Sequence, residues 1–270
     1  MWLRSRALWF CIGGMLVCDG AAAAAQHNAR DFSGVWTRGP AAQSYFRPPE
    51  SGPGPVANLT PPRPDAGGGA GTRNTGDHTS PILQPWAAEI VKRHADADRA
   101  GRPIPTAQVL CRPHGVPQIL ELNDAVQFLL TPDLFAILYA REMRPRLVYL
   151  NAAHPAALKA SAYGHSVGHW DGDTLVVDTV GLAEGTWVDR LGTPHTDRLH
   201  VVERYRRVGN AIRVDFTVED PGAFTTAWSA TASYRPQQDG AYHEQVCAEN
   251  NIDTVTGRPQ AIPTDNTPDF

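Results

Sequence analysis

The sequence predicts a mainly β protein, an antiparallel meander that closes into a β-barrel or a strongly curled sheet, with one flanking helix. From residue 126 onward the chain contains eight short runs that are rich in β-branched and aromatic residues. Turn residues separate several of these runs, and no helical pattern lies between them. Such short connections favour antiparallel pairs over βαβ units. This number of strands closes most economically into a barrel, and a two-sheet sandwich is the alternative.

The N-terminus has the pattern of a secretory signal peptide, which we assign to residues 1–25. Arg4 and Arg6 precede an apolar run, and a series of alanines then ends in an Ala-x-Ala cleavage pattern. Cleavage there leaves 245 residues (270 − 25), enough for one substantial core. No later stretch is long and apolar enough to cross a bilayer, so we expect no stable membrane insertion. The predicted location is the periplasm or the extracellular space.

Residues 26–79 are predicted to be mostly irregular. The stretch at 47–76 is rich in Pro and Gly and cannot bury enough apolar surface to order itself. One short strand is expected before it, at 31–38, where Phe32 and Trp36 are available to fill a core.

The single predicted helix spans residues 85–100. A proline opens it, Trp86, Ile90 and Val91 fall at helical spacing, and Gly101 stops it. The helix belongs to a barrel domain that we place at 80–251, followed by an irregular tail at 252–270.

The predicted strands follow in order. They are the runs at 126–132, 134–140, 146–151, 173–181, 199–208, 211–220, 226–235 and 241–249. The stretch at 163–182 is interpreted as a hairpin, because Asp171-Gly172 is typical of a two-residue type I′ turn. Apolar and polar residues alternate most clearly at 211–219, as expected for a strand with one buried face.

Cysteine usage and charge bound the partners. Cys11 and Cys18 leave with the signal peptide, and Cys111 and Cys247 are expected to form a disulfide in an oxidising compartment. The alternative is two buried free thiols, which pack as small hydrophobes. A net charge of −4 without any basic block argues against nucleic acid or an anionic membrane surface as partner. The expected partner is a small organic molecule, and the oligomeric state stays open.

Neither a metal nor an organic cofactor is predicted. His165 and His169 are four residues apart in or beside a strand, where that spacing spans roughly 13 Å, too far for one shared ion. The sequence has no HExxH or Cys-x-x-Cys pattern, no phosphate loop and no dinucleotide fingerprint. A Gly-x-Ser-x-Gly pattern does occur, GHSVG at 164–168, but it lies within the predicted hairpin and not at the strand-to-helix turn that such an elbow requires, so an α/β serine hydrolase is disfavoured.

The strongest catalytic candidates lie between Thr186 and Tyr205. They are Glu203, His200, His195 and Asp197. Glu203 shares its strand face with apolar residues, so its carboxylate is expected to be paired with Arg or His or to have a raised pKa. It is either a structural ion pair inside a barrel or a general acid or base at the floor of a pocket, with one of the histidines as proton partner. Residues expected to line such a pocket and bind substrate are Tyr163, His165, Trp170, Trp187 and Tyr205.

Five motifs in order carry a resemblance over about residues 81–251. They are "CRPHGVP", "GHSVGHWDGDTLVVDTVGL", "TWVDRLGTPHTDRLHVVERY", "VEDPGAF" and "VCAEN". Together they resemble a family of secreted bacterial proteins that is largely without assigned function, although His169 stands where a longer basic residue is expected. The resemblance implies export and a single domain, and it transfers no catalytic residue. The "DFSGVW" start is also similar to lipocalin-like barrels.

The leading hypothesis is a periplasmic enzyme that performs cofactor-independent acid/base chemistry on a small apolar or aromatic substrate. The reaction would be of the lyase, isomerase, cyclase or hydrolase type. One alternative is a lipocalin-like carrier of a hydrophobic small molecule. A second is a structural module of the envelope, which predicts a filled barrel.

Overall fold

Nine strands and one α-helix make up the regular structure of the chain in the computed structural model, which describes residues 28–38, 45–59, 75–102, 104–142, 144–243 and 245–247. The strands are β1 (Gly34–Thr37), β2 (Val126–Leu130), β3 (Leu134–Tyr139), β4 (Arg146–Leu150), β5 (His165–Asp171), β6 (Thr174–Val180), β7 (His200–Val208), β8 (Ala211–Glu219) and β9 (Trp228–Pro236). The helix is α1 (Pro85–Arg99), and a short 3₁₀ helix, η2, spans Gln118–Glu121. The predicted signal peptide, residues 60–74 of the Pro/Gly-rich stretch and the predicted tail lie outside the described residues.

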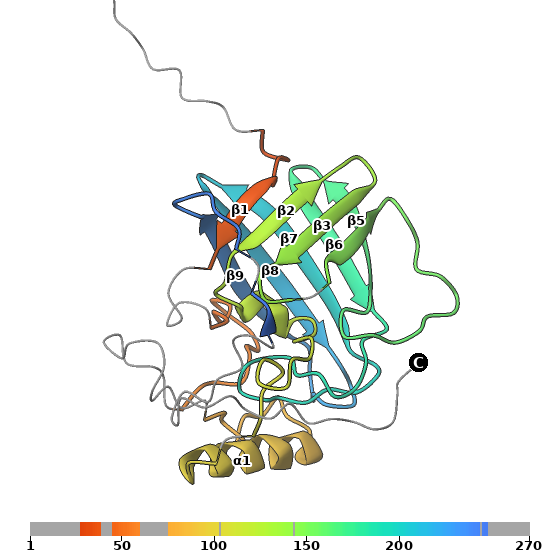
Figure 1. The fold of residues 1–270 in the computed structure, drawn as a ribbon. Coiled ribbons are helices and arrows are strands. Elements are labelled where there is room, and N and C mark those ends of the chain that lie inside the picture. The colour runs from red at the N-terminus through yellow and green to blue at the C-terminus, as the bar shows by residue number, and fades with distance from the viewer. Residues whose placement is uncertain are drawn as a thin grey trace, which may run out of the picture.

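Each strand pairs with the next along the chain, and β1 pairs with β9, so the sheet is a closed barrel (Figure 1). The predicted fold class, a mainly β barrel with one flanking helix, is confirmed. The prediction of antiparallel pairing is wrong at one junction, because β4 and β5 are parallel. The long connection at 151–164 carries the chain back along the barrel, which a parallel pair requires (Figure 1).

Two predicted boundaries differ from the structure. The run at 241–249 is not a strand in its described part. The domain predicted to begin at residue 80 omits β1, whose Trp36 is opposite Val126 on β2 and Pro236 on β9. The isolated strand expected near Trp36 is therefore the piece that closes the barrel. The predicted hairpin is present, but the predicted type I′ turn at Asp171-Gly172 is wrong: Asp171 is opposite Thr174, so the two turn residues are Gly172 and Asp173, and of these only Gly172 has a positive φ, 57°.

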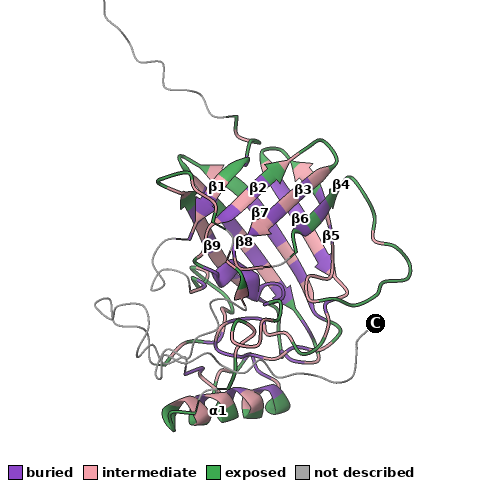
Figure 2. Cartoon of the chain, viewed as in Figure 1, coloured by how far each residue is buried: buried purple, intermediate pink, exposed green. Residues whose placement is uncertain are grey.

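Large side chains fill the barrel, and two phenylalanines from the N-terminal segment close its ends. Buried residues alternate with intermediate or exposed ones along the strands (Figure 2), so the buried residues of each strand share the face toward the interior. Phe32 packs on Trp170, beside the β5–β6 turn, with ring centroids 5.4 Å apart. Phe46 packs on Phe216 at 4.7 Å and on Trp228 at 6.5 Å, near the start of β9. These aromatic contacts close the interior from both sides.

Helix α1 lies across the Phe46 end of the barrel (Figure 1) and turns a face of small residues toward it. The helix is confirmed to within one residue, but its buried face is Ala87, Val91 and Ala95. Trp86, expected in the apolar face, is 43% exposed, and its indole N–H donates to the carbonyl of Gly222. Short side chains let the helix approach closely, and the segment beneath it meets Val91 with a glycine. A Cβ placed on that residue, Gly76, would lie 2.8 Å from the Val91 side chain.

A disulfide joins Cys111, in the loop before η2, to Cys247 near the end of the described chain. The predicted bridge is confirmed, and it spans 136 positions. It ties the loop before η2 to the segment that follows β9. Within the described ranges, no helix has the length and apolar character needed to cross a membrane.

Replacing both Cys111 and Cys247 with Ala is expected to lower the free energy of unfolding by up to about 5 kcal/mol, because the cross-link restricts a long loop in the unfolded chain. Urea unfolding of the variant and of the oxidised wild type measures this difference. Adding a reducing agent should lower the stability of the wild type and leave the stability of the double variant unchanged. Equal stability of the two oxidised proteins would contradict the expectation.

Candidate functional site

Glu203 lies inside the barrel and pairs with an arginine from another strand. Its carboxylate, on β7, is fully buried and accepts hydrogen bonds from both terminal nitrogens of Arg146 on β4, one of them at 2.9 Å. The Tyr205 hydroxyl donates to Glu203 at 2.8 Å. Arg146 also donates to the hydroxyls of Ser166 at 3.3 Å and Thr179 at 3.0 Å. Of the two sequence interpretations of Glu203, the geometry is that of the structural ion pair.

The buried charges of Arg146 and Glu203 compensate each other. Burial by itself lowers the pKa of Arg146, but the charge and hydrogen bonds of Glu203 outweigh burial and the pKa is raised. Burial also raises the pKa of Tyr205 well above its ordinary value, so its hydroxyl stays protonated and donates. Tyr205, predicted to bind substrate, is therefore committed to the ion pair.

Glu203→Gln is expected to destabilise the protein by about 3–5 kcal/mol, because it leaves the Arg146 charge buried without its counter-charge. The double variant Arg146→Met, Glu203→Leu should lose less than Glu203→Gln alone, since it removes both charges. Chemical denaturation of the three proteins gives these differences. The exposed pair of Arg213 and Asp215, 2.8 Å apart, is the control, and Asp215→Asn should cost about 1 kcal/mol or less.

The other predicted catalytic residues are not brought to Glu203. His200 is on the outward face of the same strand, where its Nε2–H donates to Asp178 at 3.0 Å. His195 is buried in the loop before β7, and its Nδ1–H donates to the carbonyl of Thr196 at 2.8 Å. Asp197 is exposed in the same loop. The four residues therefore do not share a site. Glu203 and His200 are three apart in one strand and point to opposite faces, and the other two lie in the loop before it.

Histidines meet on the outer surface around Asp178. Its carboxylate accepts from His154 and His200, each at 3.0 Å, and the Nδ1 atoms of His154 and His165 are 2.9 Å apart. Burial alone raises the pKa of Asp178, but the hydrogen bonds from His200 and His154 outweigh burial and lower it. Over the part of the chain that the structure describes, no three His, Cys, Asp or Glu side chains are placed to hold a metal ion.

The predicted substrate-binding residues are also dispersed. The Tyr163 hydroxyl donates to the nearly buried carboxylate of Glu142. His165 stacks on Tyr149 on the outer surface, with ring centroids 5.3 Å apart. Trp170 covers one barrel end, and Trp187 packs on His94 of α1 at 5.2 Å. None of these side chains lines the cavity described next.

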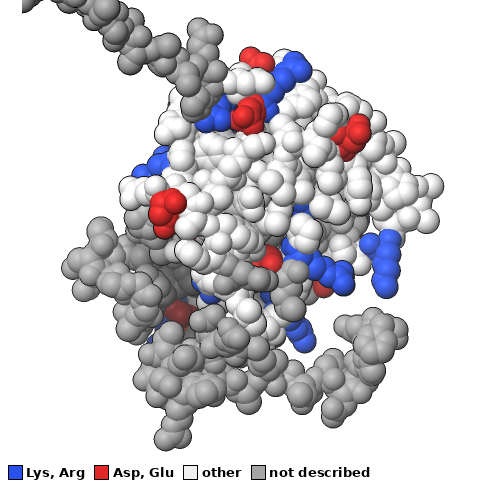
Figure 3. Space-filling view, turned by 45° about the horizontal axis from the view of Figure 1, so that its top comes forward, with Lys and Arg blue, Asp and Glu red and all other residues white. Residues whose placement is uncertain are grey.

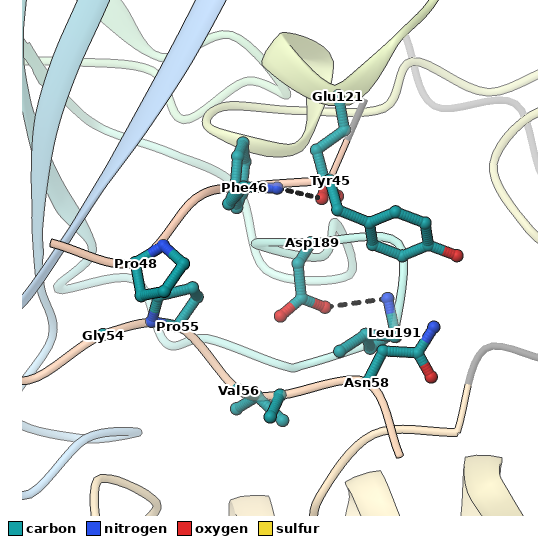
Figure 4. A pocket seen from close by; sticks show the side chains of 11 residues that line it. Tyr45, Phe46, Pro48, Gly54, Pro55, Val56, Asn58, Glu121, Asp189 and Leu191 are labelled. Carbon is teal, nitrogen blue, oxygen red and sulfur yellow. Dashed lines mark hydrogen bonds between the residues drawn. The ribbon is translucent and has the colours of Figure 1, made fainter. Parts of the chain in front are cut away.

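A cavity of about 570 Å³ lies outside the barrel, between its Phe46 end and α1 (Figure 4). Three chain segments form it: the stretch after β1, η2, and the loop between β6 and β7. Its lining residues are Tyr45, Phe46, Pro48, Gly54, Pro55, Val56, Ala57, Asn58, Glu121, Asp189 and Leu191. Figure 4 shows that Glu121 and Asp189 enter it from different segments. We take this cavity as the candidate site.

The two carboxylates in the cavity wall hold backbone in place. Glu121, on η2, accepts the N–H of Phe46 at 3.3 Å and the N–H of Arg190 at 2.6 Å, so it joins all three segments (Figure 4 shows the first bond). Asp189 accepts the N–H groups of Leu191 at 2.9 Å and Thr193 at 3.1 Å, which closes its own loop. The shape of the cavity therefore depends on these two acids.

Both acids have raised pKa values. Burial raises the pKa of Glu121 to about 7, although the charge of Arg190 opposes this. Burial likewise raises the pKa of Asp189 to about 6, against hydrogen bonds from Thr193. Arg190 also stacks over the Tyr45 ring, 4.9 Å from its centroid. The site thus combines aromatic and apolar surface with acids that are protonated more readily than usual.

Sequence reasoning missed Glu121. The signal was present, because Glu121 is flanked by Ile119, Leu120 and Leu122, a carboxylate in an apolar run. Asp189 falls within the acidic and basic stretch from which candidates were drawn, but its pattern does not distinguish it from Asp197. Pairing it with Glu121 requires a contact between segments 68 positions apart (189 − 121), which no local pattern encodes.

The contribution of Glu121 and Asp189 to stability is expected to fall as pH rises from about 4 to 7. The folded state favours the protonated acids, so it binds more protons than the unfolded chain between the ordinary pKa values, 4.5 and 3.8, and the raised ones, about 7 and 6. For Glu121 the loss across this window is on the order of 3 kcal/mol. Glu121→Gln should flatten the curve of unfolding free energy against pH, as measured by urea titration. Glu89→Gln on α1 is the control for loss of one carboxylate, and equal slopes in both variants would refute the assignment.

The described part of the face in Figure 3 is largely uncharged, with acidic and basic side chains scattered over it.

Comparison of the chain with known proteins assigns no function to the cavity. The sequence matches no family model and no curated protein. Among solved structures, a match is a secretary abundant heat soluble (SAHS) protein from Ramazzottius varieornatus, with 13% identity, a TM-score of 0.27, and coverage of 48% of this chain and 82% of that one. A similarity at this level assigns no family and no ligand to this chain.

Proposed function

We propose that the protein binds a small, neutral, mostly apolar molecule with at least one hydrogen-bonding group, in the cavity lined by Glu121 and Asp189. The observation that carries the proposal is the cavity itself, about 570 Å³ in volume and built from three segments. Ligand pockets for small molecules are typically about 300–1,000 Å³, largely apolar, with a few placed polar groups. This binding role is closest to the carrier alternative, with the site outside the barrel and not within it.

The wall chemistry supports a neutral ligand. The raised pKa of Glu121, about 7, reduces its negative charge near neutral pH, whereas Asp189, with a pKa of about 6, is still mostly ionised there and bonds the backbone of its own loop. The charges of Arg190 and Arg38 act on Glu121 in the opposite sense. A charged ligand would therefore meet no strong uncompensated charge, whereas an apolar one would contact Phe46, Val56 and neighbouring prolines.

Acid/base catalysis by Glu203, His200, His195 and Asp197 is not part of the proposal, because these side chains do not share a site. The interior that a lipocalin-like carrier would use is filled by aromatic side chains and the Arg146–Glu203 pair. Export to an oxidising compartment belongs to the proposal, and the disulfide supports it.

The test uses three probes with one ring: phenol, benzylamine and benzoate. Titration of the full chain followed by NMR chemical shifts should give the tightest binding for phenol, with perturbed amide signals at Phe46 and Leu191, whose N–H groups bond the two acids. Benzoate should bind most weakly, because its charge must be desolvated beside Glu121. Preferential benzoate binding, or shifts confined to other surfaces, would overturn the proposal.

Matched tyrosine variants supply the control. Tyr45→Ala removes ring surface from the cavity wall and should weaken phenol binding about fivefold to tenfold. Tyr149→Ala removes the same ring from the outer face of β4, where Tyr149 is 43% exposed, and should leave binding unchanged. Thermal unfolding of both variants establishes that they are folded before the titrations are compared.

A further inference from the structure

Two histidine side chains meet on the outer surface of the barrel, where neither lines the cavity of Glu121 and Asp189. The Nδ1 atom of His154, in the connection between β4 and β5, lies 2.9 Å from the Nδ1 atom of His165 on β5. The ring centroids are 5.1 Å apart, and the ring planes are inclined by 67°. Both residues are partly exposed, so a small ion in solvent has access to them.

The contact between the two Nδ1 atoms requires a positive species between them. A neutral imidazole has one N–H group and one nitrogen lone pair. Two lone pairs 2.9 Å apart would repel each other, so the interval holds either one proton, as an N–H···N hydrogen bond, or a metal ion. Nitrogens that bind one metal at about 2.0 Å and at right angles are roughly 2.8 Å apart. The separation of 2.9 Å therefore fits two neighbouring positions of a square-planar site, the geometry that Cu(II) and Ni(II) prefer.

Asp178, on β6, orients the His154 ring as a metal ligand is oriented. The Nε2–H of His154 donates to the Asp178 carboxylate at 3.0 Å, which leaves the lone pair of the neutral ring on Nδ1. A ligating histidine almost always donates its other N–H to a carboxylate or a carbonyl, and this bond fixes its tautomer and increases its basicity. The same carboxylate accepts from His200 at 3.0 Å, which fixes its own position. His165 is oriented by stacking on Tyr149, with ring centroids 5.3 Å apart.

The connection that carries His154 is attached to the sheet on both sides of this residue. Before it, the N–H of Asn151 donates to the carbonyl of Gly168 on β5 at 2.7 Å. Asn151 has a φ of 57°, a left-handed conformation that asparagine adopts more readily than most residues. After it, the N–H of Ser161 donates to the carbonyl of Gly181 at 3.1 Å. His154 is therefore in place before any ion binds, which lowers the entropic cost of binding.

We propose that His154 and His165 bind one Cu(II) ion through their Nδ1 atoms, with Asp178 as the carboxylate that orients His154. Water completes the coordination, since no third His, Cys, Asp or Glu side chain in the described part of the chain is placed to join them. Imidazole suits copper, and Cu(II) binds a given nitrogen site more tightly than Ni(II) or Zn(II). The site is independent of the proposed ligand cavity, so either proposal can fail without the other.

Titration of the full chain with Cu(II), followed by electron paramagnetic resonance, tests the inference. We expect one tightly bound ion per chain, with nitrogen splitting from two imidazoles. Asp178→Asn should weaken binding about tenfold, because it removes the charge behind His154 and keeps an oxygen acceptor. His154→Ala and His165→Ala should each weaken binding more than Asp178→Asn and lose the two-nitrogen spectrum. His169→Ala, four residues along β5 and exposed, is the control and should keep both the affinity and the spectrum.

Thermal unfolding gives a second readout and shows that the variants are folded. Cu(II) should raise the unfolding midpoint of the wild type and of His169→Ala, but not that of His154→Ala or His165→Ala, because an ion stabilises only the chain that binds it. If an alanine variant does not fold, His165→Gln, which keeps a polar side chain there, replaces it in both measurements. No saturable binding of Cu(II), a wild-type spectrum in His165→Ala or His165→Gln, or an equal loss in His169→Ala would overturn the proposal. Tighter binding of Zn(II) than of Cu(II) would also overturn it.

Discussion

The Arg146–Glu203 pair sets the arrangement on which the rest of the barrel depends. Both groups are essentially excluded from water, and each is acceptable there only because the other is present. Their shell of hydroxyls comes from β5, β6 and β7, so one polar cluster spans four consecutive strands. A shift of β4 by one residue would turn Arg146 outward and leave the buried Glu203 without its counter-charge. The pair therefore fixes the register of β4, which enters the single parallel junction.

A filled interior moves ligand chemistry to the loops. The barrel supplies a rigid base, and the segments at its Phe46 end supply the variable surface, which is the usual division of roles between scaffold and loops. The two acids of the candidate site illustrate this division, since each bonds loop backbone and only Glu121 belongs to a regular element, η2. The cavity exists because these segments are tied down by hydrogen bonds to buried carboxylates, by α1 and by the disulfide.

Local pattern was sufficient for most of the fold. The helix, the hairpin at Asp171-Gly172, the strands from β2 to β9 and the bridge between Cys111 and Cys247 follow from periodicity, turn chemistry and cysteine count. The parallel pairing of β4 and β5 does not follow from local pattern. It depends on the path of the long connection between the two strands and not on the residues of the strands themselves. The face of Glu203 was predictable from alternation along β7, whereas its partner was not, since Arg146 lies 57 positions earlier. The pocket was inaccessible to sequence reasoning for the same reason: Glu121, Asp189 and Tyr45 meet only after the barrel has formed.

The seam between β1 and β9 has a consequence for the order of assembly. Trp36 on β1 is opposite Pro236 on β9, 200 positions later (236 − 36). Strand β1 therefore cannot complete its pairing until β9 has been synthesised. Until β9 is available, the edges of β1 and β8 are both unpaired, and unpaired edges attract strands of other chains. Contacts this distant in sequence also form slowly, since a long loop must close before they contribute. The seam is only a few residue pairs long, which makes it the last interface to close and the place where a folded barrel would first reopen.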